Sequence, residues 1–90
     1  MTENNKVSLI KKLDVTDLDG EKVMIDFESG KYFLLKGAAN EIWDYIQNPI
    51  HISDILHNLM NVYDVPEDTC RESIITFLTQ LNEYKFITIE

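Results

Sequence analysis

The sequence predicts an α+β domain in which a three-stranded antiparallel sheet is followed by three helices. The first half of the chain contains short apolar segments separated by turn residues, which is typical of strands. The second half contains apolar residues at helical spacing. Because a chain of 90 residues buries too little surface for two cores, we expect residues 1–90 to form a single domain, with residues 1–6 disordered.

The first two strands are predicted to form a hairpin. One strand lies between Val7 and Leu18, where apolar residues alternate only in part. A turn follows at residues 17–21, because its Asp-Gly pair supplies the positive φ angles of a primed hairpin turn. The next strand, residues 23–27, alternates regularly. Its two faces hold Val23, Ile25 and Phe27 on one side, and Met24 and Asp26 on the other.

The third strand, residues 32–35, is apolar on both faces. A strand of this kind needs cover on both sides. We expect Phe33 and Leu35 to pack on the helices. The other pair, Tyr32 and Leu34, either joins the core or lines a groove in which an added peptide strand finds backbone partners.

Three helices follow this strand. The first spans residues 38–47 and ends before Pro49, because proline disfavours helical geometry in the preceding residue. Ser53 is expected to cap the second helix, and the third spans residues 67–84. A short final strand is expected at residues 86–89. Three helices with a small sheet indicate a winged helix-turn-helix-like domain.

Charge and composition exclude several classes of partner. The formal net charge of −8 repels phosphate backbones, and the sequence has no local cluster of Lys or Arg, so we expect no nucleic-acid partner. The sequence has no apolar run of the ~20 residues that a membrane span needs and no signal peptide, so we expect no membrane partner. The single cysteine fits a reducing cytoplasm.

Three sets of residues contain groups that catalytic or metal sites use, and none has the spacing or setting of such a site. The acidic turn at 17–21 lacks the register of a calcium loop, since its glycine comes three residues after the first aspartate. His51 and His57 are six residues apart, whereas paired ligands on one helix are three or four apart. Cys70 has acidic neighbours and so lacks the electropositive setting that a catalytic cysteine needs. We therefore expect no enzyme activity, metal or cofactor.

Several of these segments resemble the PqqD-like family, the small RiPP recognition elements that bind the leader segments of ribosomally made peptide precursors. The matching motifs are Gly30-Lys31-Tyr32-Phe33-Leu34-Leu35, Ala38-Ala39-x-x-Ile42-Trp43, Ile52-Ser53-Asp54-Ile55-x-x-x-Leu59-x-x-x-Tyr63-x-Val65, and Ile74-x-x-Phe77-Leu78-x-x-Leu81 followed by Phe86-Ile87. The resemblance covers residues 14–90. Two positions depart from it, because Lys36 and Lys85 stand where the family usually has Asn and often has Gly. Neither is expected to touch the peptide.

The resemblance implies that a leader peptide adds as a strand beside the third strand and packs in the cleft against the third helix. The expected peptide-binding residues are Lys31, Tyr32, Phe33, Leu34, Leu35, Ser73, Ile74, Phe77 and Leu81. The cleft wall is drawn from Ser73, Ile74, Thr76, Phe77 and Thr79 to Leu81. Periodicity favours Tyr32, Leu34, Ile74, Phe77 and Leu81 as the residues that point at the peptide, with Phe33 and Leu35 in the core.

The function implied by the resemblance is that of an adaptor. It would hold the leader of a precursor peptide and present the rest to a separate modifying enzyme or leader peptidase. Lasso-peptide and radical-enzyme pathways are both compatible. The acidic surface favours a leader that carries Lys or Arg.

Two other functions stay open at this point. A winged-helix DNA-binding regulator would need a basic third helix, whereas residues 67–84 hold one arginine among four acidic residues. A non-catalytic docking subunit would use the same strand to contact one enzyme. The oligomeric state is either a monomer or a homodimer formed by strand exchange.

Overall fold

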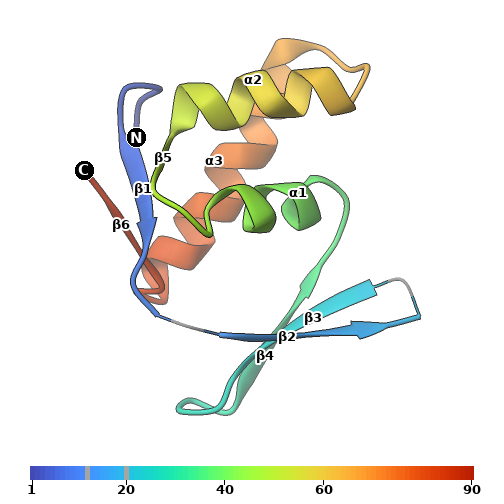
Figure 1. Cartoon of the computed structure of the whole chain (residues 1–90), viewed down its shortest axis with the longest axis vertical. Helices are drawn as coiled ribbons and strands as arrows, with labels where there is room; N and C mark the ends of the chain where they lie inside the picture. Colours follow the sequence, from blue (N-terminus) through green and yellow to red (C-terminus); the bar gives the residue numbers. More distant parts are fainter. Residues whose placement is uncertain (12, 20) are drawn as a thin grey trace.

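Two small antiparallel sheets and three helices make up the part of the chain that the structure, a computed structural model, describes: residues 1–11, 13–19 and 21–90 (Figure 1). The helices are α1 (Ala38–Tyr45), α2 (Ile52–Val62) and α3 (Glu67–Glu83). The first sheet has the order β2-β3-β4 and consists of β2 (Asp14–Leu18), β3 (Glu21–Asp26) and β4 (Lys31–Leu35). The second sheet has the order β5-β1-β6 and consists of β1 (Lys6–Leu9), β5 (Ile50–His51) and β6 (Ile87–Ile89).

The predicted fold class, a three-stranded antiparallel sheet followed by three helices, is confirmed. The prediction of one strand from Val7 to Leu18 is wrong, because that segment forms β1 and β2 in different sheets. The segment between them passes from one sheet to the other, which explains why the alternation is only partial. Lys12, within the predicted strand, lies outside the described residues.

Several of the N-terminal residues make backbone hydrogen bonds to distant parts of the chain. Lys6 begins β1, and its N–H donates to the carbonyl oxygen of Glu90 at 2.9 Å. The carbonyl oxygen of Asn5 accepts from Ile52 N–H at 2.9 Å. The N-terminus is therefore tied to the C-terminal strand and to the start of α2. None of the helices in the described part of the chain has the length and hydropathy that a membrane span requires.

The start of α2 differs from the prediction. His51, not Ser53, is the N-cap residue, because the chain enters the helix from β5 in an extended conformation. The exposed N–H groups of the first turn are satisfied by the N-terminal backbone, since Ser53 N–H donates to the carbonyl oxygen of Glu3 at 3.0 Å. The predicted first and third helices are confirmed to within two residues at their ends.

The β2–β3 hairpin has the predicted tight turn. Leu18 pairs with Glu21, which leaves a two-residue loop, and Asp19 has a φ of 52°, in the left-handed region that a primed turn requires. Gly20, the other residue of this predicted turn, lies outside the described residues.

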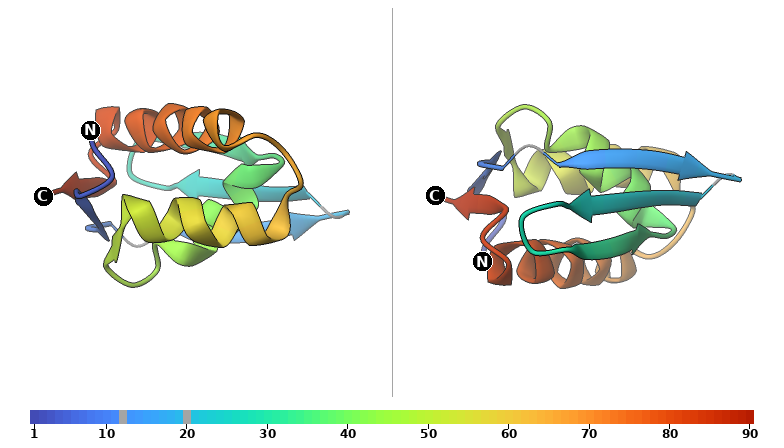
Figure 2. Two further views of the ribbon diagram at one scale, coloured as in Figure 1. Left: turned by 90° about the horizontal axis from the view of Figure 1, so that it is seen from above. Right: turned by 90° about the horizontal axis from the view of Figure 1, so that it is seen from below.

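The helices cover one face of the β2-β3-β4 sheet (Figures 1 and 2). The core lies between the helices and this face. On β3 the buried face is that of Met24 and Asp26, which are 1% and 4% exposed. The helices contribute Ile42, Trp43, Ile55, Leu59, Ile74, Leu78 and Leu81 to this core. Burying each large apolar side chain stabilises the fold by about 1.5–3 kcal/mol before entropic costs. The core therefore fixes α3 beside the sheet.

Candidate functional site

Strand β4 is one of two free edges of its sheet, and it is the apolar one. The other edge, β2, is exposed at every residue and includes Asp14 and Asp17. Charged side chains on an edge discourage pairing with another strand. In β4 the middle residues are Tyr32, Phe33 and Leu34, and the strand runs beside α3 (Figure 2, right). The edge suited to an added strand is therefore β4.

The register of β3 and β4 shows which backbone groups reach this free edge. Opposed residues in an antiparallel pair alternate between hydrogen-bonded and non-hydrogen-bonded positions. Asp26 faces the first residue of β4, and its carbonyl oxygen accepts from Gly30 N–H at 2.9 Å, so its backbone points toward β4. The first, third and fifth residues of β4, including Phe33, then bond to β3. The backbone groups of Tyr32 and Leu34 point to the free edge.

An apolar pocket of about 300 Å³ lies between β4 and α3. Its lining residues are Met24, Tyr32, Phe33 and Leu34 from the sheet, and Phe77, Gln80, Leu81 and Tyr84 from α3 and its end. The rings of Phe33 and Tyr84 are 4.9 Å apart between centroids, and Phe86 stacks on Tyr84 at 5.8 Å. These contacts place a cluster of aromatic rings beside the pocket.

A second, more polar cavity of about 550 Å³ continues from the apolar pocket toward the start of α3, and we name it the polar trough. Its lining residues are Leu34, Lys36, Ala38 and Ala39 on one side, and Thr69, Glu72, Ser73, Thr76, Phe77 and Gln80 on the other. Leu34, Phe77 and Gln80 line both cavities. The apolar pocket and the polar trough thus form one groove along the free edge of β4.

The structure brings most of the predicted site residues to this groove. Tyr32, Phe33, Leu34, Phe77 and Leu81 line the apolar pocket, and Ser73 lines the polar trough. Phe33 also packs against the core, as predicted.

Three other predicted residues lie elsewhere. Ile74, expected to face the peptide, is 1% exposed and packs in the core, because the wide apolar face of α3 turns mainly toward the other helices. Leu35 is also a core residue, at 1% exposure. Lys31 lines neither cavity, and its Nζ is 4.9 Å from the ring centroid of Tyr84.

The sequence reasoning missed several lining residues, among them Met24, Tyr84 and Glu72. Tyr84 follows Gln80 by four residues, so helical spacing could have found it. Lys36, expected not to touch a peptide, lines the polar trough. Its position reflects the turn into α1, which places it opposite α3.

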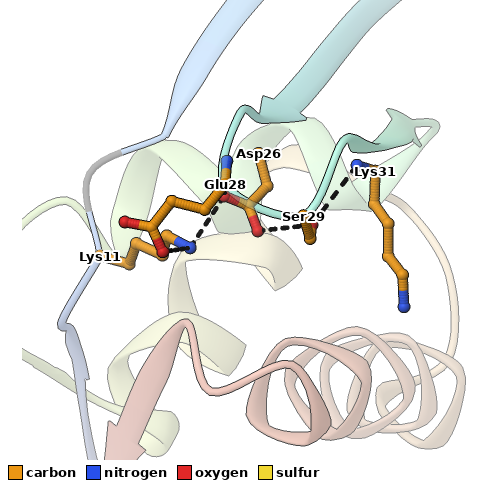
Figure 3. Close-up of polar contacts among 5 residues, drawn as sticks. All are labelled: Lys11, Asp26, Glu28, Ser29 and Lys31. Atoms are coloured by element: carbon orange, nitrogen blue, oxygen red, sulfur yellow. Dashed lines mark hydrogen bonds and ion pairs between the residues drawn. The ribbon is translucent and has the colours of Figure 1, made fainter.

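A buried carboxylate fixes the turn from which β4 begins (Figure 3). Asp26 Oδ1 lies 2.8 Å from Lys11 Nζ, and Asp26 Oδ2 accepts from Ser29 Oγ at 2.7 Å. Glu28 N–H donates to Asp26 Oδ1 at 3.3 Å. These bonds, chiefly that from Lys11, hold the pKa of the Asp26 carboxyl below its usual value. The carboxylate therefore stays charged and holds the β3–β4 turn.

These features define a class of protein: a small α+β domain with a bare sheet edge and a groove beside a helix. The chain matches the family model described as coenzyme PQQ synthesis protein D (PqqD) over residues 21–87, and it belongs to this family.

A solved structure has the same fold. It is described as TbiB1 in complex with the TbiA(beta) leader peptide, and it superposes with a TM-score of 0.73 at 20% sequence identity. The match covers 89% of this chain and 93% of that one. No curated protein sequence matches the chain significantly.

Proposed function

We propose that this protein is a peptide-binding adaptor of ribosomal peptide biosynthesis. It binds the leader segment of a precursor by strand addition to β4 and presents the precursor to a separate modifying enzyme or leader peptidase. The observation that carries this proposal is the groove beside the free, apolar edge of β4. Membership of the PqqD family and the fold shared with a leader-peptide complex support it.

Binding would combine sequence-neutral and selective contacts. The backbone groups of Tyr32 and Leu34 would bond to the main chain of the added strand, while alternate side chains enter the groove. A large apolar residue suits the apolar pocket, and polar or basic residues suit the trough with its Glu72. Micromolar affinity corresponds to about −8 kcal/mol, which two good anchors can reach after the cost of ordering the peptide.

The chemistry itself would belong to the partner enzyme. We infer that the 90 residues act as one non-catalytic domain in the cytoplasm, where the single cysteine, Cys70, stays reduced. A DNA-binding role is not favoured, since Arg71 on α3 is engaged by Glu3, Glu67 and Asp68. A homodimer formed through β4 would occupy the same edge and so compete with the leader.

A titration tests this function. A fluorescently labelled leader peptide, taken from a precursor encoded beside this protein, is added and anisotropy is followed. We expect saturable binding at micromolar concentration or tighter, lost in Leu34→Asp. Val62→Asp serves as the matched control, because Val62 on α2 is 55% exposed and Leu34 is 49% exposed. Absence of binding by the wild type would instead favour a docking subunit, and binding to duplex DNA would favour a regulator.

A further inference from the structure

Lys31, the first residue of β4, carries a positive charge to the aromatic cluster beside the apolar pocket. Its Nζ lies 4.9 Å from the ring centroid of Tyr84, which follows the last residue of α3 and lines the pocket. A cation–π contact thus places the ammonium group next to the pocket. Lys31 itself lines neither cavity, so the pocket stays open to an apolar side chain.

The carboxylates nearest to Lys31 along the strands are already paired. Asp26 is opposite Lys31 in the register of β3 and β4. Its carboxylate, however, lies 2.8 Å from Lys11 Nζ and accepts from Ser29 Oγ. Glu28 Oε2 is 2.9 Å from the same Lys11 Nζ. In Figure 3 the side chain of Lys31 extends away from both carboxylates. Lys31 forms no ion pair with any residue that the structure describes, so its charge is available to a ligand.

This free cation contrasts with the charge of the whole molecule. The net charge of −8 repels acidic ligands in general. Three of the basic side chains, Lys11, Lys22 and Arg71, are neutralised in ion pairs. Lys31 therefore creates a local positive site beside an apolar pocket. Such a pair of features suits a segment in which a carboxylate closely follows a large apolar side chain.

We propose that Lys31 is a specificity-determining residue, which binds an acidic side chain of the leader next to the apolar residue that fills the pocket. The inference rests on the proposed function and names the chemistry of the leader segment. An added strand pairs best in the antiparallel direction. Because β4 runs from Lys31 to Leu35, the C-terminal part of such a strand passes Lys31. Residues two apart lie on one face of a strand. The leader therefore carries Asp or Glu two positions after its apolar anchor.

The test uses the labelled leader peptide of a precursor encoded beside this protein, with fluorescence anisotropy as the readout. Lys31→Gln should weaken leader binding about two- to fivefold at low salt, because exposed charge pairs are weak and screened by salt. Lys6→Gln on β1 is the matched control. Lys6 is exposed like Lys31, lines neither cavity, and forms no ion pair within the described ranges. The control makes the same change in net charge and should bind leader as the wild type does.

Substitutions in the leader show whether the contact is direct. Each Asp or Glu of the peptide is replaced singly by Asn or Gln. The replacement two positions after the anchor should weaken binding to the wild type about two- to fivefold and have no further effect on Lys31→Gln. Lys31→Glu should recover binding when that leader residue is Lys. These peptides leave the protein unchanged, so they decide the outcome if Lys31→Gln alters the fold.

Three results would overturn this role of Lys31 and leave leader binding intact. They are equal weakening by Lys31→Gln and Lys6→Gln, independent effects of the protein and leader substitutions, and tight binding of a leader that has no acidic residue after its apolar anchor. Failure of the wild type to bind the leader would instead overturn the proposed function, and this inference with it.

Discussion

Lys11 Nζ lies 2.8 Å from Asp26 Oδ1, and this ion pair joins the segment between the two sheets to the end of β3. The Asp26 side chain is 5% exposed, whereas that of Lys11 is 27% exposed. Because the same carboxylate accepts from Ser29 Oγ and Glu28 N–H, it also organises the β3–β4 turn. The position of β4, the strand that forms one wall of the groove, depends on this pair.

We predict that Asp26 makes the fold sensitive to acid. Its pKa is lowered in the folded state, chiefly by the hydrogen bond from Lys11. A group with a lowered pKa contributes stability that is present above its unfolded value, about 4, and is lost as pH falls through the folded value. Asp26→Asn should therefore lower the urea midpoint at pH 7 and flatten its decline in acid.

Urea denaturation at several pH values checks this prediction, with Asp64→Asn in the α2–α3 loop as control. Asp64 is exposed, so its substitution should leave the midpoint close to that of the wild type. An Asp26→Asn protein with the wild-type midpoint and the wild-type acid dependence would show that the pair does not stabilise the fold.

Trp43 is predicted to be a main element of the core. It is 5% exposed and lies on α1, and Trp43→Ala should cost about 3–5 kcal/mol. Since a small domain has only about 5–15 kcal/mol in total, the variant should be barely folded. Far-UV circular dichroism during urea denaturation measures the loss. Met60→Ala on the exposed side of α2 is the control, and equal stability of the two variants would contradict this role of Trp43.

The helices and the β2–β3 hairpin were predictable because their signals are local. Pro49 ends the first helix region, and an Asp-Gly pair at residues 19–20 marks the hairpin turn. The β5-β1-β6 sheet was not predictable, because Val7 pairs with Ile50 and with Ile89, far along the chain. Strands β1 and β5, of four and two residues, leave too short a pattern to read, whereas the final strand was expected at residues 86–89 and β6 is Ile87–Ile89.

The groove was predictable on its strand side and only in part on its helix side. A strand that is apolar on both faces indicates that both faces are packed against other groups. Tyr32 and Leu34 of this strand line the apolar pocket. On α3 some apolar residues pack in the core and others line the groove. The sequence pattern does not show which residues face the core and which face the groove. Ile74 was misplaced because the rotation of α3 against the sheet is set by distant packing.

Tyr84 is predicted to select the leader by closing the apolar pocket. Its ring packs 4.9 Å from that of Phe33, and Lys31 Nζ lies 4.9 Å from the Tyr84 ring centroid. Tyr84→Ala removes the ring from the pocket lining. It should weaken leader binding about tenfold, which corresponds to the binding free energy that one aromatic contact contributes. Tyr84→Phe keeps the ring and should bind within about twofold of wild type. Leader anisotropy measures both, and equal weakening in the two variants would point to the hydroxyl group instead.

Glu72 is predicted to set the charge preference of the polar trough. It lines the trough opposite Lys36, whereas Glu83, near the C-terminal end of α3, does not line the groove. Glu72→Lys should weaken binding of a leader with Lys or Arg at the trough by about two- to fivefold at low salt, because exposed charge pairs contribute about 0.2–1 kcal/mol.

The same net charge change in Glu83→Lys is the control for long-range electrostatics. If Glu72 acts locally, Glu83→Lys weakens leader binding less, and the difference between the two variants shrinks as salt screens exposed charges. Anisotropy titrations at two salt concentrations measure this difference. Equal weakening by both variants would show that the leader responds to the overall charge of −8 and not to the trough. A basic leader would then be attracted by the whole surface, and the trough would contribute shape alone.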